Sequence, residues 1–397
     1  MQSLRWALAP FVCLAAALAW FVSPEPPRPL DAADRLAGRV LMVGFDGREP
    51  TSPGVARTLT QIGEGRIAGV MYLRRNVADG PQVRRLNAAF AAAAPRLPPL
   101  VALDQEGGRV SRLGWRSRFP RTPSAFAVAK RATPGEARTI YGRMARGLRD
   151  WGFNVNLGPV VDVHRADNPI IGRLGRAFAE RPETIVAYAR AFQRAHSEVG
   201  VATALKHFPG HGSSLADTHL AAVDVTGTWH VRELDPYRPL LTEAPLVMTG
   251  HVINRRLGGP EPATLSHAIV TGLLRERLGY RGVVVSDDLQ MDAIGEREEI
   301  AAEKAMRAGV DLLLFANDGR VGADLVERVV AHLAETARRD PRFETRLREA
   351  GDRIESLRER LVRCRSQSST SCASSAKPDS SISQISARRN VRSSTRR

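Results

Sequence analysis

VATALKHF, residues 201–208, is an apolar run that ends in a lysine and a histidine. An apolar run of this length, without polar alternation, is typical of a strand buried on both faces in a parallel sheet covered by helices. Similar runs recur between about residue 35 and residue 345, and we expect a strand at each of them. The predicted strands span residues 39–45, 68–73, 99–104, 154–163, 201–208, 246–251, 282–287 and 310–316.

Segments with a helical spacing of apolar residues separate these runs. They include residues 81–94, 135–152, 181–200, 266–279 and 300–309. The second and fourth close with a glycine, the usual residue at the end of a helix. Eight strand–helix units in roughly 300 residues predict an α/β fold of the (β/α)₈ barrel type with a single catalytic domain. A doubly wound open sheet is the alternative.

The amino-terminal segment differs from the body. Residues 1–23 contain one arginine followed by a largely apolar stretch, which predicts a signal peptide or a membrane anchor, with an anchor preferred. We therefore expect the body at the periplasmic face, either secreted or held at the inner membrane through residues 6–22. A cytoplasmic location is the alternative.

The carboxyl-terminal segment is equally distinct. From Arg363 onward the chain is rich in serine and arginine and nearly free of apolar residues, so we expect it to be disordered. The predicted organisation is an anchor and Pro-rich linker at 1–30, the barrel at 31–345, and a helix end with a basic tail at 346–397. All three cysteines are expected outside the barrel, which would then contain no disulfide.

The net charge of +16 reflects an excess of basic residues, many of them in the tail. We interpret the tail as a solvated segment and expect no nucleic-acid partner and a monomeric protein. Lysine is rare in this chain. Of its 58 basic residues, only four are lysines: Lys130, Lys206, Lys304 and Lys377. A lysine kept at the end of strand 201–208 suggests that a compact ammonium group is needed there.

In a (β/α)₈ barrel the reacting groups lie at the carboxyl ends of the strands, and here several strands end in charged residues or histidine. Asp287 closes the apolar run 282–287, so its carboxylate is expected at the rim, with Asp288 pointing away or capping the next segment. After strand 99–104, Asp104 is followed by Glu106, Arg109 and Arg112. These groups suit sugar hydroxyls, although a surface ion network is the simpler interpretation.

The segment after Lys206 holds several groups able to bind a metal or to transfer protons: His207, His211, Asp217 and His219. A metal site is one hypothesis. Proton transfer is preferred, because Asp217 and His219 flank a single residue and the carboxylate can orient the ring and stabilise its protonated form. His207 and His211 would then bind substrate or pack the loop. We expect no metal and no cofactor.

Four motifs add a resemblance to a known family. DQEGGRVSR (104–112), NPIIGRLGRAF (168–178), KHFPGHGSSLADTH (206–219) and VVVSDDLQM (283–291) resemble, in the same order, the single-domain bacterial β-N-acetylglucosaminidases of glycoside hydrolase family 3. The resemblance extends from about Gly38 to Arg338 and implies a (β/α)₈ barrel that releases terminal β-linked N-acetylglucosamine from peptidoglycan fragments with retention of configuration.

The resemblance also implies residue roles. Asp287 would be the nucleophile, His219 the general acid/base and Asp217 its orienting partner. The sugar would be held by Asp104, Arg112, Arg176, Lys206 and His207. Thr218 stands where the family pattern suggests serine, and Arg176 is preferred over Arg173 within its motif. The alternatives are a β-glucosidase or a β-glycoside phosphorylase of the same family, a non-catalytic cell-wall-binding barrel, and a metallohydrolase.

Overall fold

The computed structural model of the protein describes residues 30–114, 117–317 and 322–366. The expectations for residues 1–23 and for the basic tail beyond residue 366 lie outside these ranges. No helix within the described ranges is long and apolar enough to cross a membrane.

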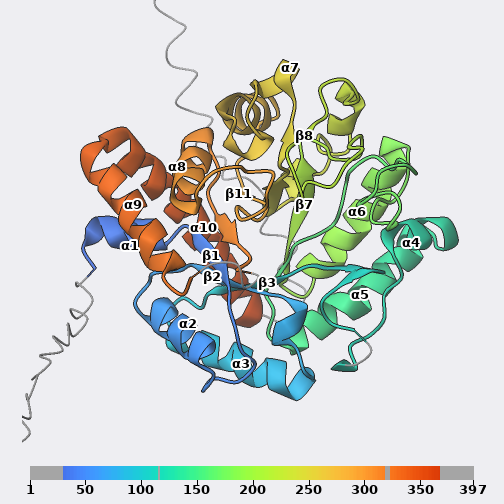
Figure 1. The fold of residues 1–397 in the computed structure, drawn as a ribbon. Coiled ribbons are helices and arrows are strands. Elements are labelled where there is room, and N and C mark those ends of the chain that lie inside the picture. The colour runs from blue at the N-terminus through green and yellow to red at the C-terminus, as the bar shows by residue number, and fades with distance from the viewer. Residues whose placement is uncertain (1–29, 115–116, 318–321, 367–397) are drawn as a thin grey trace, which may run out of the picture.

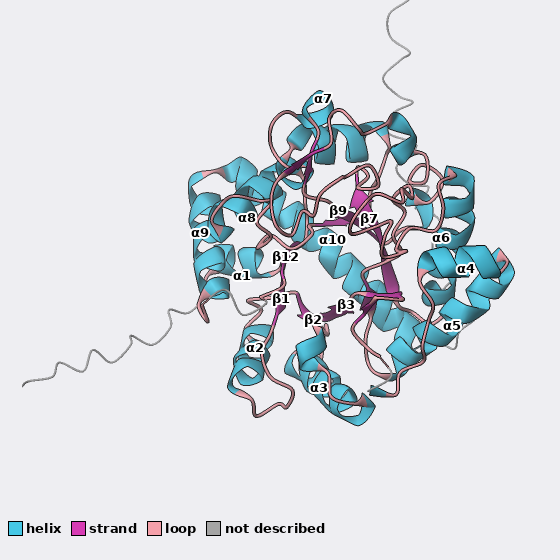
Figure 2. Cartoon of the chain, turned by 45° about the vertical axis from the view of Figure 1, so that its right-hand side comes forward, coloured by secondary structure: helices cyan, strands magenta, loops and turns pink. Residues whose placement is uncertain are grey.

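Eight parallel strands form a ring, which Figure 2 shows with helices around its outside. In chain order they are β1 (Leu41–Gly44), β2 (Gly69–Tyr72), β3 (Leu100–Leu103), β6 (Val155–Asn156), β7 (Ala202–Phe208), β9 (Leu246–Thr249), β11 (Val283–Val285) and β12 (Leu313–Phe315). Each of the eight predicted runs contains one of them. The strand order is β11-β9-β7-β6-β3-β2-β1-β12.

Two contacts close the ring between its end strands. A parallel bridge joins Val285 to Leu312, and the Val284 carbonyl accepts the N–H groups of Asp311 and Leu312. The (β/α)₈ barrel is therefore confirmed, and the open doubly wound sheet is wrong. The strand residues are almost wholly buried because side chains fill the barrel and helices cover it.

Most of the outer layer consists of α-helices that follow the strands (Figure 1). The helices are α1 (Ala32–Gly38), α2 (Pro53–Gly63), α3 (Gly80–Ala93), α4 (Ala125–Arg131), α5 (Pro134–Asp150), α6 (Pro182–Ser197), α7 (Arg255–Gly258), α8 (Glu298–Ala308), α9 (Leu325–Arg339) and α10 (Pro341–Ser366), with a π-helical segment η6 (Ala268–Arg277). Their termini follow the sequence signals. Before α5, for example, Thr133 and Glu136 form a reciprocal capping box around Pro134.

The last helix, α10, covers the amino-terminal end of the barrel. Arg358 on α10 donates to the carbonyl of Pro98 before β3, and Arg346 donates to the carbonyl of Val310 before β12. The buried residues of α10 recur every three or four positions: Phe343, Leu347, Ala350, Ile354, Leu357 and Leu361. The folded part therefore runs past the boundary expected at residue 345, and the opposite, carboxyl-terminal end of the barrel stays open.

Two details of the carboxyl-terminal half bear on the expectations. Cys364 lies in α10, beyond residue 345 and so outside the expected barrel, and it is disulfide-bonded. The other two cysteines, Cys13 and Cys372, lie outside the described residues. Between β7 and β9 the chain forms no α-helix. Residues 209–245, all of them described, contain only the short strand β8 (Val223–Asp224) and two 3-10 turns, η3 (Val231–Leu234) and η4 (Leu241–Glu243). A loop thus replaces a helix directly after β7.

Candidate active site

The residues expected to form a site lie at the open, carboxyl-terminal rim of the barrel. Asp104 directly follows β3, Lys206 and His207 lie within β7, and Asp287 stands two residues beyond β11. Parallel strands bring these positions to one end of the barrel, although they are far apart in the sequence.

A buried lysine joins two carboxylates at this rim. The Nζ atom of Lys206 lies 2.8 Å from Asp104 Oδ1 and 2.7 Å from Glu106 Oε1, and its side chain is only 2% exposed. Each carboxylate has a second cation. Arg112 Nη2 donates to Asp104 Oδ2 at 2.7 Å, and Arg176 Nε and Nη2 donate to the two oxygens of Glu106 at 2.9 and 2.8 Å. Glu106 is thus an internal counterion.

The charges in this network stabilise one another. Burial alone would raise the pKa of both carboxyl groups, but the cations outweigh it and lower the pKa of Glu106 to about 2 and that of Asp104 well below its usual range. Burial would lower the pKa of Lys206, but the two carboxylates reverse the shift and raise it. All three groups are therefore charged at neutral pH, which presents fixed acceptors and donors to a polar ligand.

A short hairpin carries Glu106 and Arg112 to the rim. It pairs β4 (Gln105–Gly107) with β5 (Val110–Ser111), and the amide of Gln105 fixes it by bonding both the N–H and the carbonyl of Leu113 at 3.0 Å. Gly107 has a φ of 105°, and a Cβ there would lie 2.3 Å from the Pro123 carbonyl oxygen. Only glycine fits this turn without strain.

Asp162 organises the end of β7 from beneath. Its Oδ1 accepts the backbone N–H groups of His207 and His211 at 3.2 and 2.8 Å, and its Oδ2 lies 2.7 Å from His207 Nδ1. Asp162 is fully buried. The peptide bonds Lys206–His207 and Phe208–Pro209 are cis. The other ring nitrogen of His207, Nε2, lies 3.3 Å from Arg176 Nη2, so this histidine joins the charged network to the following loop.

The loop after β7 carries a carboxylate–imidazole pair. Asp217 Oδ1 lies 2.6 Å from His219 Nδ1 and also accepts the backbone N–H of His219 at 2.9 Å. The His219 side chain is 60% exposed, which leaves its Nε2 edge accessible to a ligand. Burial would raise the pKa of Asp217, but its bonds to His219 outweigh this and lower it. Asp217 can therefore orient the ring and stabilise its protonated form.

Asp287 lies half-buried at the end of β11. Its Oδ1 accepts the backbone N–H of Asp288 at 2.9 Å. Burial would raise its pKa, but the positive potential of His251, His207 and His219 lowers it. His219 contributes to this lowering of the pKa although it lies on a different loop from Asp287. Asp288 turns away, as expected, and accepts the N–H groups of Gln290 and Ala316.

The ring nitrogens of the histidine cluster engage separate partners rather than a common point. His211 Nε2 lies 3.0 Å from the Thr218 hydroxyl, while His207 and His219 each contact an aspartate. Burial and the neighbouring His207 lower the pKa of His211 to about 4, so this ring is neutral at pH 7. In the described part of the chain, no group of three or more His, Cys, Asp or Glu residues is arranged to hold a metal ion.

The five residues expected to bind the sugar lie together in this network. The two arginines of the motif at residues 168–178 differ in burial. Arg176 is nearly buried on Glu106, whereas Arg173 is exposed. Sequence reasoning assigned no role to Asp162 or His251. His251 is fully buried and spans Thr264 Oγ1 and the Asp288 carbonyl. Both residues lie at the ends of predicted strands, so their position was a usable signal.

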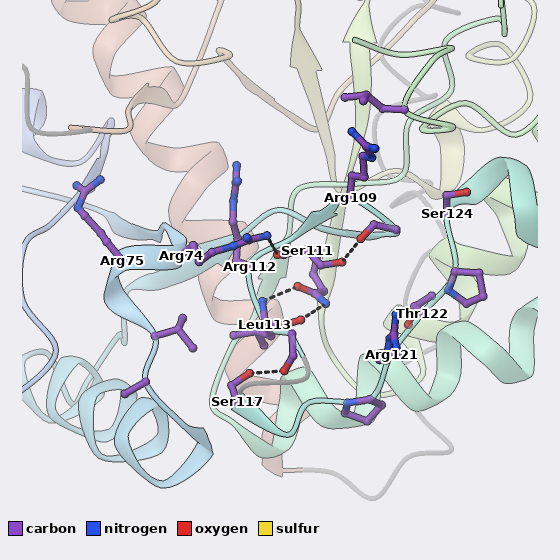
Figure 3. Close-up of a pocket in the computed structure, with 18 of the residues that line it drawn as sticks. Arg74, Arg75, Arg109, Ser111, Arg112, Leu113, Ser117, Arg121, Thr122 and Ser124 are labelled. Carbon is purple, nitrogen blue, oxygen red and sulfur yellow. Dashed lines mark hydrogen bonds between the residues drawn. The ribbon is translucent and has the colours of Figure 1, made fainter.

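A cavity of about 1250 Å³ opens beside these residues rather than over Asp287 (Figure 3). It borders the charged network around Lys206 at Arg112, and the loops after β1, β2 and β3 supply most of its walls. The rim therefore offers two adjoining regions: the charged cluster around Lys206, and this wider cavity.

Comparisons with known proteins agree with this geometry. Residues 51–350 match the family model described as "Glycosyl hydrolase family 3 N terminal domain". The chain is 38% identical over 290 residues to a protein named beta-hexosaminidase from Stenotrophomonas maltophilia, covering 70% of this chain and 83% of that one. It is 36% identical over 320 residues to a beta-hexosaminidase from Alkalilimnicola ehrlichii, covering 77% and 87%.

Solved structures give the same result. A glycoside hydrolase family 3 beta-N-acetylglucosaminidase from a Paenibacillus species superposes with a TM-score of 0.75 at 31% identity, over 84% of this chain and 63% of that one. A beta-N-acetylhexosaminidase from Beutenbergia cavernae superposes with a TM-score of 0.74 at 30% identity, over 84% of this chain and 100% of that one.

Proposed function

The chain belongs to glycoside hydrolase family 3, and from this premise we propose that it is a retaining exo-β-N-acetylglucosaminidase acting on peptidoglycan fragments. One observation carries the proposal. A carboxylate, Asp287, follows β11 at the barrel rim, and the loop after β7 at the same rim carries an aspartate–histidine pair, Asp217 and His219. A nucleophile and a separate acid/base are the two groups that a retaining glycosidase needs.

In the first step, Asp287 attacks the anomeric carbon of the terminal sugar. Its Oδ2 has no hydrogen bond to any residue that the structure describes and is the oxygen free to attack. The protonated His219 gives its proton to the glycosidic oxygen as the bond to the aglycone breaks. The products are a glycosyl ester on Asp287 and the released aglycone, with His219 now neutral.

In the second step, neutral His219 removes a proton from water as the water oxygen attacks the anomeric carbon. The ester breaks, Asp287 recovers its carboxylate, and His219 is protonated again. Asp217 stabilises the imidazolium in both steps. The anomeric carbon is inverted twice, so the released sugar keeps its configuration. We assign Asp104, Arg112, Arg176, Lys206 and His207 to holding this sugar through the network around Lys206.

An assay with 4-nitrophenyl β-N-acetylglucosaminide tests the proposal, with ¹H NMR of the first-formed anomer to establish retention. Turnover of the glucoside but not of the N-acetyl sugar would make the protein a β-glucosidase instead. An imidazole acid/base repels an incoming phosphate less than a carboxylate does, so the assay is repeated in phosphate. Formation of N-acetylglucosamine 1-phosphate would identify a phosphorylase.

We further propose that the enzyme works as a monomer at the periplasmic face of the membrane. The apolar segment within residues 1–23 supports this location. Cell fractionation with an antibody to the barrel tests it, since recovery in the cytosolic fraction would contradict it.

A further inference from the structure

The cavity beside the sugar-binding network is lined by arginines. They come from successive rim loops: Arg48 after β1, Arg74 and Arg75 after β2, and Arg109, Arg112 and Arg121 after β3. No aspartate or glutamate is found among the described residues that line it. Figure 3 shows Arg74, Arg109 and Arg112 around the hairpin at Ser111, with Arg75 and Arg121 at opposite sides.

Most of these positive charges are not neutralised within the protein. Arg75 pairs with Asp46, and Arg112 pairs with Asp104. Arg48, Arg74, Arg109 and Arg121 are exposed, and none has an acidic side chain within 4.0 Å in the described part of the chain. Four like charges around one cavity raise its positive potential and favour an anionic ligand.

The sugar that the proposed reaction releases cannot be this ligand. N-acetylglucosamine is uncharged, and the network around Lys206 supplies its contacts. The cavity meets that network at Arg112, so a ligand in it continues from the terminal sugar into the aglycone. A volume of about 1250 Å³ exceeds that of one monosaccharide.

We propose that this cavity binds the aglycone and selects aglycones that carry several carboxylates, such as a peptide attached to the second sugar. This inference rests on the proposed glycosidase function. Arginines at separate points around the cavity suit several spaced carboxylates better than a single phosphate, and each can bind a carboxylate through two N–H groups. The hydroxyls of Thr122 and Ser124 add neutral donors.

The test compares two synthetic substrates in which N-acetylglucosamine is β-linked to a sugar bearing a short peptide. Their peptides differ only in having free carboxylates or carboxamides. Each exposed arginine contact is expected to contribute about two- to fivefold. The wild-type kcat/KM should therefore be about fivefold to twentyfold higher for the carboxylate form. High ionic strength should reduce this preference.

Variants place the effect in the cavity. Arg74→Gln combined with Arg121→Gln should abolish most of the preference, mainly through KM, and leave cleavage of the neutral 4-nitrophenyl substrate unchanged. Arg281→Gln removes an exposed arginine just before β11, at the opposite end of the barrel, and should keep the preference. Equal kcat/KM for both wild-type substrates, or an equal loss in Arg281→Gln, would overturn the proposal.

A failure of the proposed function would look different, because the neutral substrate would not be cleaved either. Titration calorimetry with the free aglycone then tests the cavity by itself. Tighter binding of the carboxylate form, lost in the double variant, would support the cavity's role. Equal binding of the two forms would refute it.

Discussion

Replacing Lys206 by methionine tests whether the buried network holds the rim together. The methionine side chain would keep most of the volume but remove the ammonium that contacts both Asp104 and Glu106. Each carboxylate would keep one arginine and lose its shared cation, at a site where the lysine is only 2% exposed. Removing one partner from a buried ion pair costs about 3–5 kcal/mol, so Lys206→Met should lower the free energy of unfolding at pH 7 by that amount.

Lys304 provides a matched control, because it also bridges two carboxylates. Its Nζ lies 3.2 Å from Glu261 and 2.6 Å from Glu296, but the side chain is 38% exposed. Solvent screens such a pair, so Lys304→Met should cost about 1 kcal/mol or less. Urea unfolding of both variants, followed by circular dichroism at 222 nm, measures the difference.

The pH dependence of Lys206→Met provides an independent check. Burial opposes the ionisation of Glu106, but Arg176 and Lys206 lower its pKa to about 2, so the stability it contributes is present above its unfolded pKa of 4.5 and is lost as pH falls toward 2. Lys206→Met removes part of that contribution. The difference in unfolding free energy between wild type and variant should therefore become smaller as pH falls from about 5 to about 3. An equal loss of unfolding free energy in both lysine variants would contradict this prediction. So would a difference from wild type that does not change with pH.

Substitutions at three further positions test the loop that carries the proposed acid/base. Burial raises the pKa of Glu233 to about 7. Because the carboxyl ionises near pH 4.5 in the unfolded chain, the folded state loses about 3 kcal/mol of stability as pH rises from 4.5 to 7. In urea unfolding, Glu233→Gln should therefore gain stability over wild type at pH 8 relative to pH 5. Thr218→Val removes the hydroxyl bonded to His211 and should lower kcat about fivefold, whereas Thr218→Ser should retain it. His219→Ala should slow substrates with poor leaving groups by about 10²–10⁴-fold and dinitrophenyl glycosides far less; equal slowing would contradict the acid role.

Much of the barrel could be predicted because its strands are buried on both faces. Most of these strands leave an apolar run, and the polar residue that ends the run marks the rim, whereas β6 (Val155–Asn156) is short and contains a buried asparagine. The same rule separated Asp287, which stays at the rim, from Asp288, which caps the next segment. The expected boundary at residue 345 divided α10, because the helix is dominated by arginine and glutamate and its buried stripe shows only at a three- and four-residue spacing.

The contacts within the site were harder to predict. Glu106 looked like a possible sugar ligand, but its carboxylate is occupied by Arg176 and Lys206. That pairing joins residues 70 positions apart, so no local pattern encodes it. Asp162 binds two backbone N–H groups that converge only because residues 207–211 turn back above it. Local spacing did identify the Asp217–His219 pair, because its two members flank one residue.

We propose that Asp287 forms a covalent glycosyl-enzyme. The direct measurement is incubation with a fluorinated glycosyl fluoride, which slows hydrolysis of the intermediate, followed by proteolysis and mass spectrometry. We expect one added sugar per chain, located on Asp287 and absent from Asp287→Ala. A sugar attached to another residue, or turnover of the normal substrate with inversion and no adduct, would contradict it.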